Sequence, residues 1–332
     1  MPADDQLPAL SDYLDDTLTE VRRDGDGDPN PQRAPKEAAP PADPDLLTVA
    51  VCTTDGQVCS AGDRGHVFPL QSVSKAFVYA LVLEQHGIPA VLDRVDVEPS
   101  GEAYDILSLE EGSKRPDNPM INAGAMTIHS LLGPEGTNED TRVRLLVEGL
   151  SRMAGRDLDL DENAAADELA GGHRNLAIAH LLRAENILPD DPLEVVRGYL
   201  RQCWVRVTVE DLATMAATLA NSGVQPCTGE RVVSDEVARH TLSVMMTCGM
   251  YDSAGDWMSE VGIPAKSGVS GAIMGALPGR VGLAAFSPKL DPHGTSVRSQ
   301  AVFERLADDL GLHLLDDPRR REAEWKRLVS GA

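Results

Sequence analysis

The feature of this sequence that most restricts its fold is an apolar helix that begins beside a serine and a lysine. Residues 77–83 (FVYALVL) are apolar nearly all round the predicted helix, so the helix should run through a core and not along a surface. Gly87 is expected to end it. A chain of 332 residues has ample material for such a core.

Ser72 and Lys75 stand at the start of this helix, at positions i and i+3, and should project from one face. A lysine in an apolar setting is hard to desolvate as a cation, so its pKa should fall and leave an amine that can take the serine proton. The helix N-terminus would favour a developing oxyanion. The alternative is ordinary: Ser72 caps a helix and Lys75 is a surface lysine whose ammonium reaches solvent.

A second motif, Lys266-Ser267-Gly268-Val269, precedes an apolar strand candidate at 281–286. It is similar to the K-[ST]-G strand that accompanies S-x-x-K in serine acyl-transfer enzymes, which include penicillin-binding proteins and β-lactamases. In those enzymes the amide after the glycine and the amide of the nucleophile form an oxyanion hole. Val269 and Ser72 would supply these amides.

Strand patterns lie at the two ends of the chain and enclose a helical middle. Residues 46–54 and 57–61, joined by Asp55-Gly56, predict a hairpin with a type I′ turn. Further strands are expected near 264–300, and helices at 11–23, at 300–311 and within 316–329. We expect an α+β fold in which N- and C-terminal strands form one antiparallel sheet covered by helices. The expected division is an N-terminal helix and Pro/Asp-rich loop (1–44), a sheet subdomain (45–104 and 261–332) and an inserted helical subdomain (105–260).

Composition and the first residues of the chain disfavour two kinds of partner and predict a cytoplasmic location. The formal net charge of −23 disfavours nucleic acid and anionic membranes as partners. The first residues show no basic and apolar export pattern, which predicts a cytoplasmic location. The five cysteines have no C-x-x-C spacing and the histidines no H-E-x-x-H spacing, so we expect reduced thiols, no metal site and no cofactor.

Taken together, the motifs resemble the serine-dependent glutaminases, the bacterial and kidney/liver-type family built on the β-lactamase/D,D-peptidase-like fold. The resemblance spans about residues 45–300. Beside Q-S-V-S-K, it is carried by ordered blocks at 118–125 (NPMINAGA), 174–179 (RNLAIA), 199–203 (YLRQC), 249–252 (GMYD) and 264–269 (PAKSGV).

The resemblance implies hydrolysis of L-glutamine to glutamate and ammonia through an acyl-enzyme on Ser72, with Lys75 as the base. It also implies an ammonium-binding carboxylate, Glu168, electrostatic help from Lys266, and a homodimer or homotetramer. Either Tyr199 or Tyr251 could relay a proton. The implied substrate contacts come from Ser72, Asn122, Glu168, Asn175, Tyr199, Tyr251 and the backbone of Val269.

The sequence departs from the family pattern at two places near the expected site. Residues 33–44 contain no aromatic residue where the family usually has a tyrosine, and Tyr13, Tyr79 and Tyr104 lie outside that window. Trp204 follows Gln202-Cys203 where the family generally has a serine. Two other functions remain open at this point: a β-lactamase or D,D-peptidase, which shares both lysine motifs, and a glutamine-binding homologue that has lost turnover.

Overall fold

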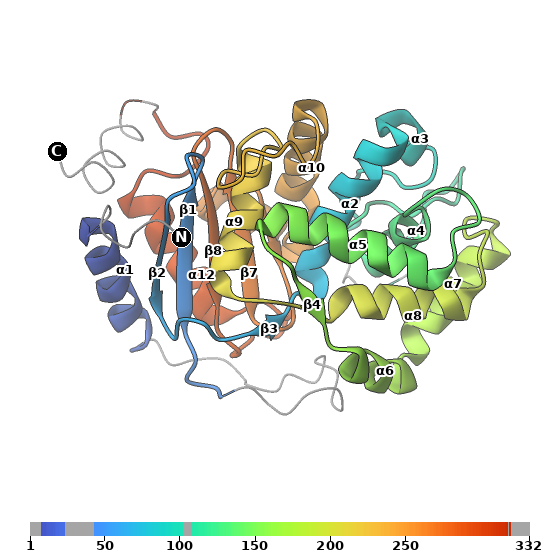
Figure 1. Ribbon diagram of the computed structural model, residues 1–332, viewed down its shortest axis with the longest axis horizontal. Helices are drawn as coiled ribbons and strands as arrows, with labels where there is room; N and C mark the ends of the chain where they lie inside the picture. The colour runs from blue at the N-terminus through green and yellow to red at the C-terminus, as the bar shows by residue number, and fades with distance from the viewer. Residues whose placement is uncertain (1–7, 24–42, 102–105, 107, 318, 320–332) are drawn as a thin grey trace.

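The computed structural model describes residues 8–23, 43–101, 106, 108–317 and 319, and it has the predicted α+β architecture (Figure 1). The main sheet is antiparallel, with strand order β2-β1-β8-β7-β6. Strands from the two ends of the chain therefore lie side by side, since Thr48 pairs with Phe286 and Thr53 with Val281. The strands are β1 (Thr48–Thr53), β2 (Val58–Gly62), β6 (Ala265–Ser267), β7 (Ala272–Leu277) and β8 (Val281–Phe286).

The predicted β1–β2 hairpin is present, but its turn differs from the predicted type. A type I′ turn needs positive φ at both central residues, and of the Asp55-Gly56 pair only Gly56 has it, with φ of +89°. The turn is closed by Gly56 N–H donating to the Thr53 carbonyl at 3.0 Å and Thr53 N–H donating to the Gln57 carbonyl at 2.9 Å. The type I′ prediction was therefore wrong, although the strands on either side were predicted correctly.

Helices cover both faces of the sheet. Side chains alternate along β8, so that Leu283 and Ala285 pack with α1 (Pro8–Val21) and α12 (Val297–Asp309), while Ala284 packs on the side of α9 (Val209–Ala220). Figure 1 shows α9 in front of the sheet and α12 behind it. At Gly282 a Cβ would lie 2.1 Å from the Ala217 backbone nitrogen, so glycine is what allows α9 to approach β8 this closely.

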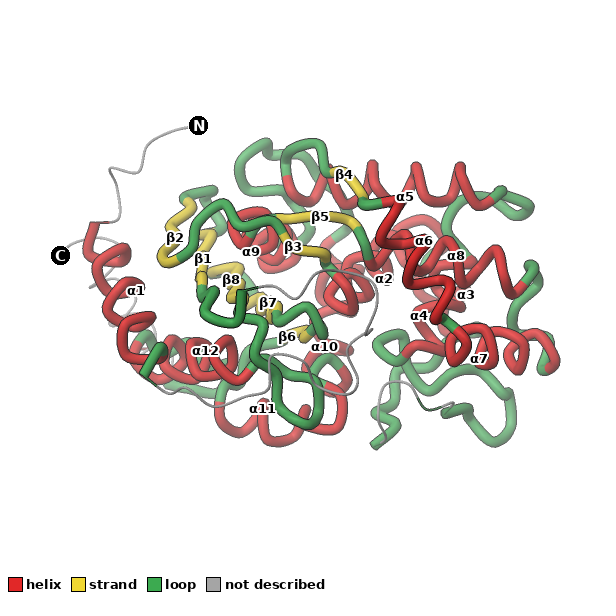
Figure 2. Tube along the Cα trace, turned by 90° about the horizontal axis from the view of Figure 1, so that it is seen from below, coloured by secondary structure: helices red, strands yellow, loops and turns green. Residues whose placement is uncertain are grey.

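A helical region lies beside the sheet, and α2 (Ser74–His86) runs between the two (Figure 2). Local signals start several of its helices: the Thr208–Asp211 capping box precedes α9, and the Ser234 hydroxyl caps α10. The predicted subdomain boundaries remain a prediction. The other helices are α3 (Ile88–Leu92), α4 (Asn122–Ser130), α5 (Glu139–Ala154), α6 (Glu162–Gly171), α7 (His173–Ala184), α8 (Pro192–Cys203), α10 (Asp235–Cys248) and α11 (Ala254–Glu260).

The structure adds a small sheet that the sequence pattern did not predict. Its strands are β3 (Phe68–Pro69), β5 (Val205–Val207) and β4 (Asp159–Leu160), in the order β3-β5-β4. Strands of two or three residues are too short to show a period of two, which explains why they were missed. This sheet holds the chain just before Ser72, because Phe68 pairs with Val207 and the Leu70 N–H donates to the Val205 carbonyl at 2.9 Å.

The terminal helices have slightly different bounds from those expected. The helix predicted at 11–23 is α1 (Pro8–Val21), and the one predicted at 300–311 is α12 (Val297–Asp309). Most of the predicted loop before residue 44 and most of the helix predicted within 316–329 lie outside the described residues. Within the part of the chain that is described, none of the helices has the length and apolar character needed to cross a membrane.

Candidate active site

Ser72 and Lys75 are both buried where a short 3₁₀ turn, η1 (Gln71–Val73), leads into α2. Ser72 is 7% exposed and Lys75 is 1% exposed. Neither η1 nor α2 has a side-chain hydrogen bond at its N-cap, so Ser72 is not a capping residue. Lys75 does not reach the surface either. The ordinary alternative for this pair is therefore wrong, and α2 ends at Gly87, with φ of +79°, as predicted.

Gln71, the residue before Ser72, has a strained backbone. Gln71 has φ of +48°, which costs a non-glycine residue on the order of 1–3 kcal/mol and is typical of functional sites. Its carbonyl accepts a hydrogen bond from Ser74 Oγ at 2.7 Å, and Ser74 Oγ in turn accepts one from Gln202 Nε2 at 3.1 Å. Gln202 Oε1 lies 3.0 Å from His129 Nδ1. Burial lowers the pKa of His129 to about 3, so its ring is neutral and this supporting chain carries no charge.

Lys75 belongs to a cluster formed by four helices. Its Nζ donates to Asn122 Oδ1 at 2.7 Å, and the same oxygen accepts from the Tyr199 hydroxyl at 3.3 Å. Asn122 Nδ2 donates to Asn175 Oδ1 at 3.0 Å. Burial raises the pKa of Tyr199 well above its usual value, so that phenol stays protonated and acts as a donor. The structure thus brings four predicted residues from α2, α4, α7 and α8 together.

The turn before α4 explains why Asn122 is presented at a helix start. Asn118 Oδ1 accepts hydrogen bonds from the backbone N–H groups of Met120 and Ile121, at 3.0 and 3.2 Å. This is the local turn that an Asn side chain favours. A Cβ at Gly124 would lie only 1.9 Å from the Asn118 carbonyl oxygen, so the segment folds back on itself only with glycine there. The 118–125 block is therefore a structural device that fixes Asn122.

Glu168 is held by two donors, and neither of them is among the predicted site residues. Trp204 Nε1 donates to Glu168 Oε2 at 2.5 Å, and Gln71 Nε2 donates to the same oxygen at 3.4 Å. Burial raises the pKa of Glu168, and the hydrogen bonds from Trp204 and Gln71 oppose that shift. Trp204 had been noted only as a bulky departure from the family pattern. The donor is the indole N–H of Trp204. The side chain of a serine at this position is shorter and could not place a donor at the same point.

Lys266 is fully buried below Tyr251. Its Nζ donates to the carbonyls of Gly249 and Ser267 at 2.9 and 2.7 Å, and it lies 3.7 Å from the centre of the Tyr251 ring. Burial, followed by the nearby charge of Lys75, lowers the pKa of Lys266 well below its usual value. Lys266 is thus a buried amine with a lowered pKa, and the lowered pKa expected for Lys75 stays a prediction. Tyr251 itself has φ of +55°, and Lys75 Nζ lies 5.9 Å from its ring centre.

The segment that carries the second motif packs against the turn at Ser72. A Cβ on Gly268 would lie 3.0 Å from Val73 Cγ2 and 3.2 Å from the Leu70 carbonyl oxygen, so the two segments are in close contact there. Ser72 immediately precedes Val73, and Val269 immediately follows Gly268. The two amides expected to form an oxyanion hole thus lie on segments in direct contact.

Two of the tyrosines outside the expected window have partners elsewhere. The Tyr13 hydroxyl donates to Asp309 Oδ2 at 2.8 Å, and the Tyr79 hydroxyl lies 2.8 Å from His240 Nε2. Tyr104 and most of residues 33–44 lie outside the described residues. Within the described part of the chain, no group of three His, Cys, Asp or Glu side chains is placed to hold a metal ion.

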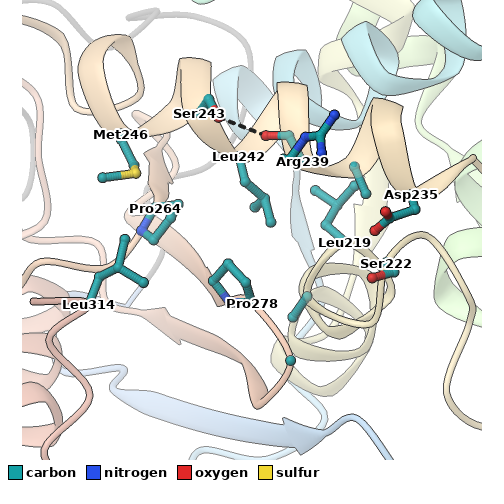
Figure 3. A pocket seen from close by; sticks show the side chains of 13 residues that line it. Leu219, Ser222, Asp235, Arg239, Leu242, Ser243, Met246, Pro264, Pro278 and Leu314 are labelled. Carbon is teal, nitrogen blue, oxygen red and sulfur yellow. Dashed lines mark hydrogen bonds between the residues drawn. The ribbon is translucent and has the colours of Figure 1, made fainter. Parts of the chain in front are cut away.

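A cavity of about 320 Å³ lies apart from this cluster, between α9, α10 and the β7–β8 turn (Figure 3). Its wall is mainly apolar, with Leu219, Leu242 and Met246 facing Pro278 and Pro264. None of the predicted site residues lines it. The convergence of ionisable and amide side chains at Lys75, and not this cavity, therefore marks the candidate active site.

Comparison with known proteins shows which family the chain resembles. The family model described as Glutaminase matches residues 38–315. A glutaminase of Clavibacter michiganensis subsp. michiganensis is 48% identical over 318 residues, covering 95% of each chain. A glutaminase of Corynebacterium efficiens is 47% identical over 306 residues, covering 92% of this chain and 72% of the relative.

Solved structures show the same fold. The glutamate form of Mglu has a TM-score of 0.88 at 47% identity, covering 93% of this chain and 70% of that one. A probable glutaminase of Bacillus subtilis has a TM-score of 0.85 at 32% identity, covering 93% of this chain and 99% of its own. With a family match over most of its length and nearly half of its residues identical to those of curated relatives, the chain belongs to the glutaminase family.

Proposed function

We propose that this glutaminase-family enzyme hydrolyses L-glutamine to L-glutamate and ammonia through a γ-glutamyl ester on Ser72. The observation that carries the proposal is the close packing of Gly268 against Val73, since it sets the second lysine motif against the nucleophile turn. An acyl-transfer serine needs a base and an oxyanion site within reach of one carbonyl, and these two segments carry both.

Acylation would begin when Lys75 removes the Ser72 proton and Ser72 Oγ attacks the side-chain amide carbon of glutamine. The amides of Ser72 and Val269 would stabilise the oxyanion of the tetrahedral intermediate, an effect worth about 3 kcal/mol per donor in other enzymes. Collapse of the intermediate transfers a proton to the leaving nitrogen and releases ammonia. Water then attacks the ester by the same route and releases glutamate.

Of the two tyrosines, Tyr251 is the better proton relay. Lys266 Nζ lies 3.7 Å from the centre of the Tyr251 ring, whereas Lys75 Nζ is about equally far from both ring centres, 5.9 Å for Tyr251 and 6.0 Å for Tyr199. Tyr199 is nearly fully buried, its pKa is raised by burial, and its hydroxyl donates to Asn122. Tyr199 is therefore suited to holding Asn122 in place and not to exchanging a proton.

The remaining side chains fit the two charged ends of an amino acid. Glu168 would pair with the α-ammonium group, because it is the half-buried carboxylate of the cluster and two donors fix its position. Asn122 and Asn175 offer amide groups to the α-carboxylate or the reacting amide without adding charge. L-Asparagine should be a poor substrate, because its side chain is one methylene shorter and its amide would fall short of Ser72 while the α-groups stay bound.

Ammonia release from L-glutamine by wild-type protein and by Ser72→Ala tests the proposal. The variant should lose about 10³-fold or more in kcat, whereas Ser243→Ala, at an exposed serine of α10, should keep full activity. Diazo-oxo-norleucine, an electrophilic glutamine analogue, should label Ser72. Labelling at another residue, binding of glutamine without ammonia release, or hydrolysis of nitrocefin without glutaminase activity would each contradict the proposal.

The setting of the enzyme is part of the proposal. We expect cytoplasmic activity, which the five free cysteines support, and a homodimer or homotetramer, as the family resemblance implies. Neither nucleic acid nor membrane is expected as a partner, given the net charge of −23. Light scattering during size-exclusion chromatography would measure the assembly.

A further inference from the structure

Two side-chain pairs join the helices α4 and α8. The Tyr199 hydroxyl donates to Asn122 Oδ1 at 3.3 Å, and His129 Nδ1 lies 3.0 Å from Gln202 Oε1. Residues seven apart on α4 and three apart on α8 share one face of each helix, so both pairs use the same two faces. The first pair belongs to the lysine cluster, whereas the second leads to the turn before Ser72.

The second pair begins a linear hydrogen-bond network that ends at the backbone carbonyl of Gln71. Gln202 Nε2 donates to Ser74 Oγ at 3.1 Å, and Ser74 Oγ donates to the Gln71 carbonyl at 2.7 Å. His129 and Ser74 are fully buried, and Gln202 is 1% exposed. Because Gln71 has φ of +48° and directly precedes Ser72, the network holds the strained residue of the turn that carries this serine.

The direction of each hydrogen bond follows from the carbonyl at the end of the network. A carbonyl oxygen can only accept, so the Ser74 hydroxyl must donate to it and accept from Gln202. The Gln202 amide therefore turns its nitrogen toward Ser74 and its oxygen toward His129. Since the amide oxygen also can only accept, His129 Nδ1 must carry a proton.

The other ring nitrogen of His129, Nε2, is left without a proton. Among the described residues Nε2 has no hydrogen-bond partner, and a Cβ on Gly198 would lie 2.4 Å from it. An N–H at this point would be a buried donor without an acceptor, which is costly. Burial lowers the pKa of His129 to about 3, although the Gln202 hydrogen bond opposes the shift, and the charges of Arg142 and Arg201 lower it further. The ring is therefore neutral, with its proton on Nδ1.

We propose that His129 and Gln202 are positioning residues for Ser72. With its proton on Nδ1, His129 orients the Gln202 amide. The amide in turn directs the Ser74 hydroxyl to the Gln71 carbonyl, which keeps the strained turn in place. The inference rests on the proposed role of Ser72 as the nucleophile, since a small displacement of a reacting atom lowers the rate of the chemical step.

The protonated nitrogen of His129 can be measured on the wild-type protein without a substrate. With isotope-labelled histidine, nitrogen NMR should show Nδ1 protonated and Nε2 unprotonated, unchanged across the pH range in which an ordinary histidine titrates. His129→Gln identifies the signals by their loss. A proton on Nε2, or titration of this ring in that range, would overturn the proposal whether or not the protein hydrolyses glutamine.

Two variants that each break one link measure the effect on catalysis. Gln202→Met keeps the length of the side chain but removes both hydrogen-bonding groups, and Ser74→Ala removes the hydroxyl. Each should lower kcat for L-glutamine about tenfold, with a smaller change in KM. Because both residues act through one network, the double variant should lose about as much as either single variant. Thr218→Val removes a buried hydroxyl of α9 that donates to the Met153 carbonyl, and it should keep the wild-type kcat.

A third variant, Gln202→Glu, tests the direction of the hydrogen bonds through pH. A protonated carboxyl group both donates and accepts, as the amide does, whereas an ionised one can only accept. The ionised form would draw the Ser74 hydroxyl away from the Gln71 carbonyl. The kcat of this variant, relative to the wild type, should therefore be near one at low pH and fall as the new carboxyl group ionises. Gln202→Met has no titratable group and should show the same relative loss at every pH.

The outcomes that contradict the positioning role differ from those that contradict the proposed function. Losses that multiply in the double variant, an unchanged kcat in Gln202→Met, or a relative kcat of Gln202→Glu that does not fall with pH would each refute the positioning role. Circular dichroism at each pH establishes that the variants are folded. The proposed function fails on other results: no ammonia release by the wild type, or full activity in Ser72→Ala.

Discussion

Replacement of Trp204 by phenylalanine should weaken glutamine binding through Glu168. The change keeps an aromatic ring but removes the indole N–H, which donates to Glu168 Oε2 at 2.5 Å. A hydrogen bond to a charged group contributes about 1.5–3 kcal/mol, and about 1.4 kcal/mol corresponds to a factor of ten. Because Gln71 Nε2 still donates to the same oxygen at 3.4 Å, we expect the lower end of this range.

The expected result is a loss of roughly 10- to 30-fold in kcat/KM for L-glutamine, mostly as a higher KM. Glu168 would bind the α-ammonium group equally in the ground state and in the transition state, so kcat should change little. The same measurement with 4-carbamoylbutanoate, which is glutamine without its α-amino group, supplies the control. Wild type and variant should process that compound alike.

The pH dependence gives a second readout of the same contact. Glu168 binds ammonium in its ionised form, and burial raises its pKa, so the acidic limb of kcat/KM should lie above the range of an ordinary glutamate. The Trp204 hydrogen bond lowers that pKa, so Trp204→Phe should move the limb to still higher pH. An unchanged kcat/KM, or an equal loss with 4-carbamoylbutanoate, would refute the role of this contact. Circular dichroism would establish that the variant is folded.

Three further predictions concern stability and the oxyanion site. Gly124→Ala should lower the free energy of unfolding by about 3 kcal/mol or more, because the added Cβ would lie 1.9 Å from the Asn118 carbonyl oxygen. Gly255→Ala, in a helix with open space around this position, should be neutral or slightly stabilising. Urea unfolding measures both. The pKa of His129 is lowered from its ordinary value near 6.5 to about 3, so between these pH values the unfolded chain binds more protons than the folded chain. The free energy of unfolding should therefore fall as pH drops below about 6.5, by up to about 1.4 kcal/mol per pH unit. His129→Gln should remove this slope, whereas His180→Gln, at an exposed histidine, should leave it unchanged. Gly268→Ala should lower kcat by about tenfold or more with a near-normal melting temperature, because the added Cβ would lie 3.0 Å from Val73 Cγ2 and press on the turn at Ser72. An unchanged kcat would contradict the placement of Val269 in the oxyanion site.

The sequence by itself determined the local features of this protein. Four local features could be predicted, because each depends on residues a few positions apart. These are the apolar character of α2, the serine and lysine at its start, the capping box at Thr208 and the hairpin strands. The pairing of terminal strands also followed, since each strand needs a partner to bury its apolar face. The proposed site residues come from the family motifs, and their roles stay predictions.

Only the tertiary structure decided which of these side chains contact one another. Trp204 meets Glu168, and burial lowers the pKa of Lys266, although no spacing in the sequence indicates either of these. Hydrogen bonds and desolvation act over a few ångströms, and the distance between two side chains on different elements is set by packing across the whole core. Local patterns therefore predict candidate catalytic groups, whereas packing determines the partners and the protonation of each side chain.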